Sequence, residues 1–208
     1  MPDVRARCDC VQVHVTFSSS FHGAGILAGG PYWCANDNLA IALSTCMNGT
    51  VRAAAYVAGS CWGIVTHGGR VIAQPPVTEL VTVTKTTALS GFADDPSNLA
   101  DDRVWLYSAL NDTVVATSVV KATEAYCTWT PLCCARRCEA WLNCVAEPSP
   151  PADNTFINDP TTQMKAIYDH EGEHAQVTKY FGNPCMSLKS PYMCVGFAHP
   201  SAWCGVHV

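Results

Sequence analysis

Residues 11–17 read Val-Gln-Val-His-Val-Thr-Phe, in which every second side chain is apolar. Strict alternation of apolar and polar residues is typical of a β-strand that buries one face. Residues 39–46 and 51–58 are small, apolar and compatible with strands, and the Asn48-Gly49 dipeptide between them is a strong hairpin signal. The start of the chain is therefore predicted to be built from strands.

The same pattern continues through the first 125 residues at short spacing. Further strands are predicted at 61–66, 70–74, 80–87, 104–110 and 114–120. Residues 91–102 are rich in Asp, Asn, Ser and Gly and are predicted to form a loop. Many short strands joined by turns favour a sandwich or an irregular barrel.

The character of the sequence changes after residue 126, where helices are predicted. Thr130 can cap a helix that has Pro131 in its first turn. Four cysteines would lie on this helix: Cys133, Cys134, Cys138 and Cys144. A second helix is predicted from Asp159, a capping residue, to the Gly182 stop signal.

The predicted fold class is α+β. It combines a β-rich N-terminal domain at residues 1–125 with a two-helix, cysteine-rich region at residues 126–208. The alternative is that both parts form one continuous domain. The chain has 208 residues, 49% of them hydrophobic and 14% charged, which excludes general disorder.

Charge and hydropathy exclude two further classes of protein. The net charge is −5 and the sequence has no run of basic residues, so a nucleic-acid partner is not expected. No apolar stretch approaches the roughly 20 residues that span a bilayer. The first residues lack an apolar signal region, which predicts either no Sec export or a processed form.

The thirteen cysteines predict an oxidising compartment, extracellular or equivalent, in which disulfides persist. Disulfides are favoured over structural zinc sites because Cys8-x-Cys10 and Cys134-x3-Cys138 do not match the pairs of ligands that zinc knuckles use. An odd total leaves at least one thiol free or paired with another chain, so an intermolecular disulfide is possible.

The segment His170-Glu171-Gly172-Glu173-His174 matches the pattern H-E-x-x-H inside the second predicted helix. Two histidines four residues apart would project from one helix face and could bind one Zn²⁺. The glutamate after the first histidine could then take a proton from a metal-bound water. The alternative is that both imidazoles are buried with hydrogen-bonded ring nitrogens.

Over Asp159–Gly182 the sequence resembles the zincin metallopeptidases. The resemblance implies a zinc cofactor bound by His170 and His174, with Glu171 as general base and acid. The sequence departs from the family pattern because Asp169 and Glu173 hold positions that are usually uncharged.

The third zinc ligand is the larger departure, because no Asp or Glu follows Glu173. His199 is the preferred third ligand, ahead of His207 next to the C-terminus, and His67 from the β-rich part is a further alternative.

These observations lead to two functional hypotheses. The first is a secreted zinc-dependent hydrolase, a peptidase, that acts on a peptide or protein substrate. The second is a non-enzymatic extracellular subunit, stapled by disulfides, that forms filaments or adheres to copies of itself through exposed strand edges.

Overall fold

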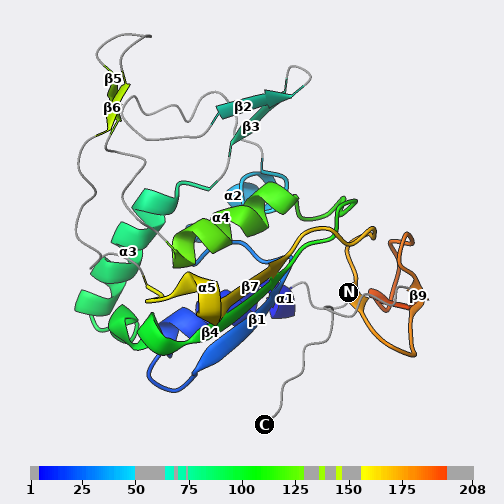
Figure 1. Ribbon diagram of the computed structural model, residues 1–208, viewed down its shortest axis with the longest axis horizontal. Helices are drawn as coiled ribbons and strands as arrows, with labels where there is room; N and C mark the ends of the chain where they lie inside the picture. Colours follow the sequence, from blue (N-terminus) through cyan, green and yellow to red (C-terminus); the bar gives the residue numbers. More distant parts are fainter. Residues whose placement is uncertain are drawn as a thin grey trace.

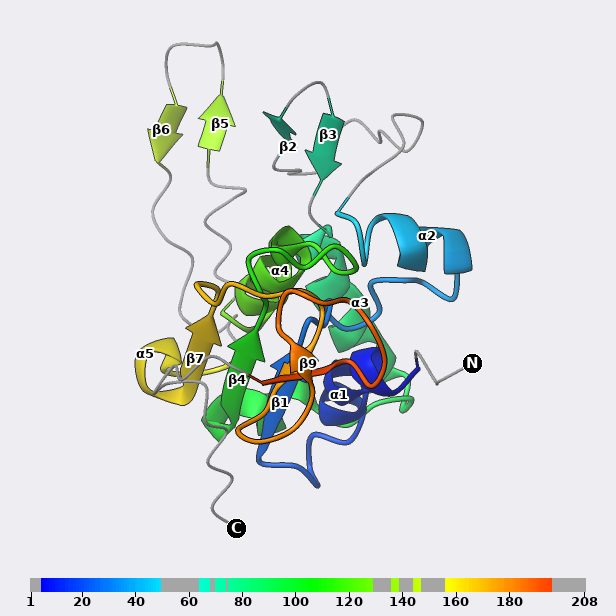
Figure 2. The ribbon, with the colours of Figure 1, turned by 90° about the vertical axis from the view of Figure 1, so that its right-hand side faces the viewer.

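The computed structural model describes residues 5–49, 64–67, 70–73, 75–128, 136–138, 144–146 and 156–195. Its centre is a sheet of three parallel strands in the order β1-β4-β7. The strands are β1 (Gly23–Leu27), β4 (Arg103–Tyr107) and β7 (Met164–Ile167). Figure 2 shows them side by side and pointing the same way, and the sheet draws on sequence from both sides of residue 125.

The hydrophobic core lies on one face of this sheet. Ile26, Leu106 and Ala166 stand opposite one another in the register of the three strands. They belong to one apolar cluster with Val11 of α1 (Arg5–Thr16) and Val119 of α4 (Thr117–Cys127). Helix α3 (Val77–Leu89) packs beside α4 and contributes to the same cluster (Figure 1). Two neighbouring parallel strands must be joined by a crossover connection, and in this sheet the crossover connections contain helices.

Helix α1 replaces the strand predicted at residues 11–17, so that prediction is wrong. Its buried side chains include Val11, His14 and Val15, which follow helical spacing, whereas Val13 is 38% exposed. Three valines at alternate positions fit a strand pattern, but two of them also fall on one helix face. Packing against β1 stabilises the helix, because tertiary contacts outweigh the weak strand preference of valine.

The strand predicted at 80–87 is also wrong, because these residues lie within α3. Its threonines bond the carbonyl one turn earlier: Thr82 Oγ1 donates to Thr78 O at 3.0 Å, and Thr84 Oγ1 donates to Leu80 O at 2.8 Å. Such bonds satisfy the hydroxyls inside a helix, so a threonine-rich segment does not need to be extended.

Two more predicted strands are helical. Residues 39–46 contain α2 (Leu39–Ser44), whose N-terminus is capped by the side chain of Asn38 through the backbone amides of Ala40 and Ile41. Most of the strand predicted at 114–120 overlaps α4, which begins at Thr117. A capping asparagine before a short apolar run is a helix signal, and the apolar run alone does not distinguish the two structures.

Neither predicted C-terminal helix is present as predicted. Residues expected in the first form β5 (Arg136–Cys138) and β6 (Cys144–Ala146), which pair antiparallel. The second is a single turn, α5 (Pro160–Gln163), followed directly by β7. Asp159 does cap α5, as predicted, by accepting a hydrogen bond from Thr161 N. The cap signal was therefore right and the length of the helix was wrong.

Other elements agree with the sequence pattern. The strands predicted at 61–66 and 70–74 correspond to β2 (Ile64–His67) and β3 (Arg70–Ala73), which form an antiparallel pair. The predicted loop at 91–102 ends in a 3₁₀ helix, Pro96–Asp101. The mixed helix and sheet class is confirmed, but a sandwich or barrel is not what the described residues form. The predicted strand at 51–58 lies outside the described residues.

A second small sheet follows β7. It contains β8 (Gln176–Val177), β9 (Asn183–Pro184) and β10 (Met193–Val195) in the order β8-β10-β9. Among the described residues, no helix is both long and apolar enough to cross a membrane.

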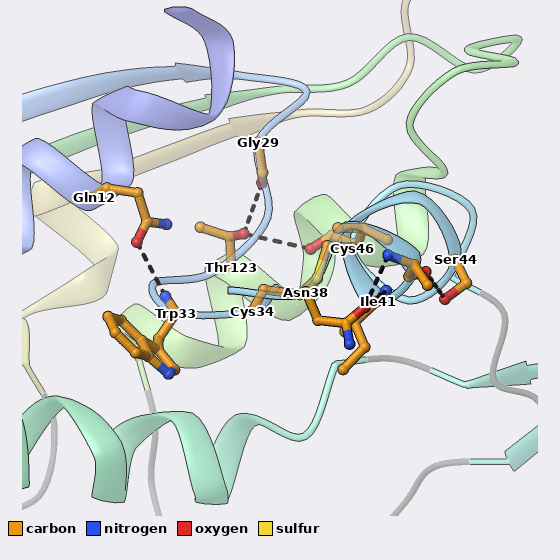
Figure 3. The surroundings of a disulfide bond; sticks show 11 residues. Gln12, Gly29, Trp33, Cys34, Asn38, Ile41, Ser44, Cys46 and Thr123 are labelled. Atoms are coloured by element: carbon orange, nitrogen blue, oxygen red, sulfur yellow. Dashed lines mark hydrogen bonds between the residues drawn. A yellow bond between two sulfur atoms is a disulfide. The ribbon is translucent and has the colours of Figure 1, made fainter. Parts of the chain in front are cut away.

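The prediction of disulfides is confirmed at two places. Cys34–Cys46 ties the loop after β1 to the turn after α2, and Cys185–Cys194 ties β10 to the turn after β9. Figure 3 shows the first, beside which Thr123 Oγ1 donates to Gly29 O at 2.7 Å. Cys127 is a free thiol within the described part of the chain, and burial raises its pKa to about 12. A thiol of that pKa stays protonated and behaves as a small apolar side chain.

Tyr126→Phe is expected to lower the free energy of unfolding by about 1 kcal/mol. The Tyr126 hydroxyl lies 2.6 Å from Thr84 Oγ1, and both side chains are buried between α3 and α4. Since Thr84 donates to Leu80 O, Tyr126 donates to Thr84, and its loss leaves a buried oxygen lone pair without its donor. Urea denaturation of both proteins measures the difference, and an equal midpoint would contradict the assignment.

Candidate active site

An aspartate and a histidine meet beyond the ends of two neighbouring strands. His174 Nδ1 lies 2.9 Å from Asp112 Oδ2, and the two side chains are 10% and 2% exposed. Asp112 follows β4 and His174 follows β7, which are adjacent and parallel. The carboxyl ends of parallel strands meet at one edge of a sheet, and ligands bind there in open α/β sheets. Residues 62 apart in the chain are thus brought together.

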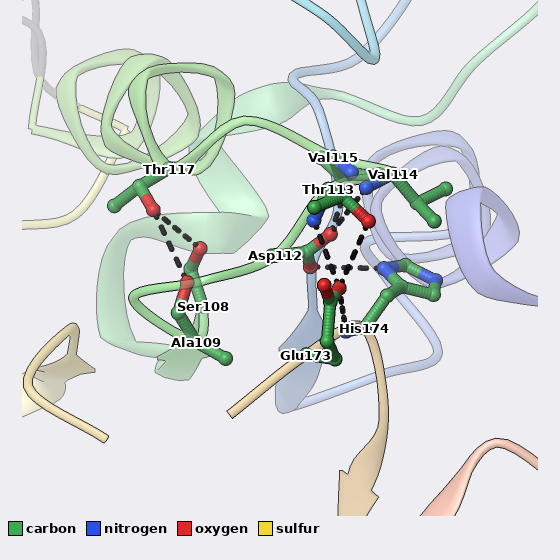
Figure 4. Close-up of polar contacts among 9 residues, drawn as sticks. All are labelled: Ser108, Ala109, Asp112, Thr113, Val114, Val115, Thr117, Glu173 and His174. Atoms are coloured by element: carbon green, nitrogen blue, oxygen red, sulfur yellow. Dashed lines mark hydrogen bonds and ion pairs between the residues drawn. The ribbon is translucent and has the colours of Figure 1, made fainter. Parts of the chain in front are cut away.

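The loop after β4 holds the Asp112 carboxylate in place. Asp112 Oδ1 accepts hydrogen bonds from Val114 N at 2.9 Å and Val115 N at 2.7 Å (Figure 4). The other oxygen, Oδ2, is thereby directed at the imidazole. The two backbone bonds therefore fix the orientation of the carboxylate.

The segment that carries His174 runs beside the Asp112 loop. Leu110 N donates to His170 O at 2.9 Å and Asn111 N donates to Gly172 O at 3.0 Å. Behind it, Ala175 packs in a buried cluster with the Cys185–Cys194 disulfide. Backbone hydrogen bonds on one side and a disulfide on the other therefore fix the position of the histidine.

The pair can act as a proton-transfer unit. An ionised carboxylate can only accept a hydrogen bond, so His174 donates through Nδ1 and its Nε2 is the nitrogen that exchanges a proton. This is the role that an aspartate and a histidine share in hydrolases with a catalytic triad. In Figure 4 the ring of His174 points to the side on which α1 lies.

His170 is bound to a different partner. Its Nδ1 lies 2.8 Å from the Tyr107 hydroxyl, at the end of β4, and the His170 side chain is buried. Burial, together with the nearby Asp112 carboxylate, raises the pKa of Tyr107 far above its usual range. Tyr107 therefore remains protonated and links β4 to the segment before His174.

The structure does not build the predicted zinc site. Residues 170–174 lie in a loop, so His170 and His174 do not share a helix face, and their rings contact Tyr107 and Asp112. Glu171 is exposed. Within the described part of the chain, no group of three or more His, Cys, Asp or Glu residues could hold a metal ion.

The predicted third ligands add no zinc site to the described residues. His199 and His207 lie outside the described residues, and His67 lies in β2. The alternative reading of the two histidines, as buried rings with hydrogen-bonded nitrogens, fits the Nδ1 bonds of both.

Asp112 was not among the sequence-predicted site residues. The sequence pattern places it between the strands predicted at 104–110 and 114–120, and the pattern contains neither the direction nor the neighbours of a strand. The signal that was present is an acidic residue directly after a well-patterned strand, with a histidine after a later strand. That signal becomes specific only once β4 and β7 are known to be adjacent and parallel.

Comparisons with known proteins identify what the chain is similar to. It is 30% identical over 184 residues to a poly(3-hydroxybutyrate) depolymerase from Delftia acidovorans, which covers 88% of this chain and 27% of that protein. No family model matches the sequence. The chain thus spans about a quarter of the length of this curated relative.

Two solved structures share the fold. A PHB depolymerase with a serine-to-alanine substitution, in complex with an R3HB trimer, has a TM-score of 0.57 at 20% identity, over 90% of this chain and 43% of that chain. The PHB depolymerase from Penicillium funiculosum has a TM-score of 0.54 at 20% identity, over 88% and 42%. These similarities overturn the zincin interpretation and, with it, the zinc-dependent peptidase.

Proposed function

We propose that this chain carries the acid–base pair of an esterase that hydrolyses polyesters of the poly(3-hydroxybutyrate) type. The observation that carries the proposal is the 2.9 Å contact between His174 Nδ1 and Asp112 Oδ2 at the edge of the parallel sheet. The similarity to depolymerases over 88% of the chain supplies the substrate class.

His174 moves the proton in the proposed reaction. As an attacking oxygen bonds to the ester carbonyl carbon, Nε2 takes the proton of that oxygen. When the bond between the carbonyl carbon and the alcohol oxygen breaks, the imidazolium returns the proton to the departing alkoxide. Asp112 stays ionised throughout, and its charge stabilises the imidazolium that forms between the two steps.

The attacking oxygen belongs to a serine hydroxyl or to water. In α/β-hydrolases the order along the chain is serine, acid, histidine, and the serine stands where a strand turns into a helix. Here Asp112 precedes His174, and α1 precedes both. Residues 1–7, which include the start of α1, contain no Ser, Thr or Cys, so we assign the attacking oxygen to no residue there. With a serine the product is an acyl intermediate, which water hydrolyses through the same proton movements; with water the acid forms directly.

The two disulfides support an oxidising compartment. We propose that the enzyme acts outside the cell, where it has access to an insoluble polymer. A polymer substrate replaces the peptide substrate expected from the sequence. The expected intermolecular disulfide stays a prediction.

The test is an assay of the purified protein on suspended poly(3-hydroxybutyrate), on p-nitrophenyl butyrate and on casein. We expect release of 3-hydroxybutyrate and of p-nitrophenol, no cleavage of casein, and no effect of a zinc chelator. A fluorophosphonate followed by peptide mapping distinguishes the two attacking groups, because it labels an activated serine and not a water.

The matched control is the same assay on His174→Ala, with folding checked by circular dichroism. Ester hydrolysis that is as fast in this variant as in the wild type would show that the pair is not the catalyst. A folded wild-type protein that cleaves neither ester would refute the proposed function.

A further inference from the structure

Glu173 connects the two loops that meet at the Asp112–His174 pair. Its Oε2 accepts hydrogen bonds from Thr113 N at 3.1 Å and from Thr113 Oγ1 at 2.9 Å (Figure 4). The same oxygen lies 3.3 Å from His174 N. One carboxylate oxygen therefore binds the residue after the aspartate and the backbone of the histidine.

Three successive backbone amides donate hydrogen bonds to two different carboxylates. Val114 N and Val115 N donate to Asp112, whereas Thr113 N donates to Glu173. Asp112 belongs to the loop that supplies the amides, but Glu173 comes from the opposite loop. The bonds of Glu173 thus add a side-chain link between the two loops, whereas the two amide bonds of Asp112 fix the shape of its own loop.

The backbone of Glu173 is itself held. Glu173 N donates to Cys185 O at 2.7 Å, and Cys185 is joined to Cys194 by a disulfide. The side chain therefore reaches from a braced segment to Thr113. Movement of Thr113 relative to this segment would change the alignment of the neighbouring Asp112 carboxylate with His174 Nδ1.

From these contacts we infer that Glu173 is a positioning residue, which holds the Asp112 carboxylate and the His174 imidazole in register through its hydrogen bonds to Thr113. The catalytic part of this inference rests on the proposed ester hydrolysis. The geometric part, the register of the two side chains, stands independently of it.

Three variants separate hydrogen bonding from charge. Glu173→Ala removes the acceptor, and we expect kcat for p-nitrophenyl butyrate to fall by about 10- to 100-fold with little change in KM, since small misplacements of catalytic groups cost rates of this order. Glu173→Gln keeps an oxygen that accepts both Thr113 bonds, and its kcat is expected to stay within about 3-fold of wild type. Thr113→Val removes one donor and is expected to lower kcat less than Glu173→Ala does.

A spectroscopic readout makes the test independent of substrate. In protein labelled with ¹⁵N-histidine, the Nδ1–H proton of His174 reports its hydrogen bond to Asp112. We expect this resonance to shift or broaden in Glu173→Ala and to be retained in Glu173→Gln. The charge-matched control is Glu79→Ala on α3, whose side chain is exposed and which should change neither kcat nor the resonance.

The outcomes are distinct. A wild-type protein without ester hydrolysis would refute the proposed function, and the resonance would still test the register. The inference is overturned if Glu173→Ala and Thr113→Val leave the resonance at its wild-type position, or if Glu173→Gln perturbs it as much as Glu173→Ala does. If Glu173→Ala does not fold, Thr113→Val decides, and a resonance that stays at its wild-type position in that variant overturns the inference.

Discussion

Asp112→Asn is expected to lower kcat for ester hydrolysis by roughly 10³- to 10⁴-fold while the protein stays folded. The asparagine oxygen can still accept from Val114 N and Val115 N, so the loop keeps its bonds. The amide NH₂ then faces His174 Nδ1 and donates to it. The imidazole must in turn carry its proton on Nε2, where it can no longer act as a base.

The measurement is kcat and KM as functions of pH, for the wild type and the variant at equal folded concentration. We expect the loss in kcat, with KM little changed, because the aspartate acts on the imidazole and not on bound substrate. Asp37→Asn is the matched control, since Asp37 is exposed and an asparagine tolerates its positive φ of 53°. A kcat for Asp112→Asn close to that of the wild type would exclude the pair as the proton-transfer unit.

The distinction between strand and helix was hard to predict because short apolar runs fit both. Val11, Val13 and Val15 satisfy a period of two, yet the helix buries Val11, His14 and Val15. What decides between them is the surface that the segment meets, here the core face of β1 and β4. That surface comes from residues far along the chain, which no local pattern contains.

Sequence signals that act through a few neighbouring residues predicted the structure more accurately than the apolar patterns did. The capping side chain of Asp159 and the two strands β2 and β3 were predicted correctly, because a cap or a short strand depends on only a few neighbouring residues. The H-E-x-x-H match was also local, but its meaning depended on a helix of about twenty residues. Once that segment formed β7, the same two histidines acquired unrelated partners, Tyr107 and Asp112.

A second buried pair should matter for stability instead of activity. His14 Nε2 lies 2.7 Å from Asp102 Oδ2, and the two residues are 6% and 2% exposed. The pair joins α1 to the residue before β4, 88 positions later in the chain. His14→Leu leaves the Asp102 carboxylate buried without its donor, and we expect the free energy of unfolding to fall by about 3–5 kcal/mol.

The double variant His14→Leu with Asp102→Leu separates the two explanations of such a loss. If the loss comes from an uncompensated buried charge, removing the charge as well should recover most of the stability, since apolar replacements of a buried pair are often close to neutral. If it comes from packing, the double variant should be less stable than either single one. His22→Leu is the control, because that side chain is exposed. Urea denaturation of the wild type, His14→Leu, Asp102→Leu and the double variant gives the coupling free energy directly, and a coupling near zero would mean that His14 and Asp102 do not stabilise one another.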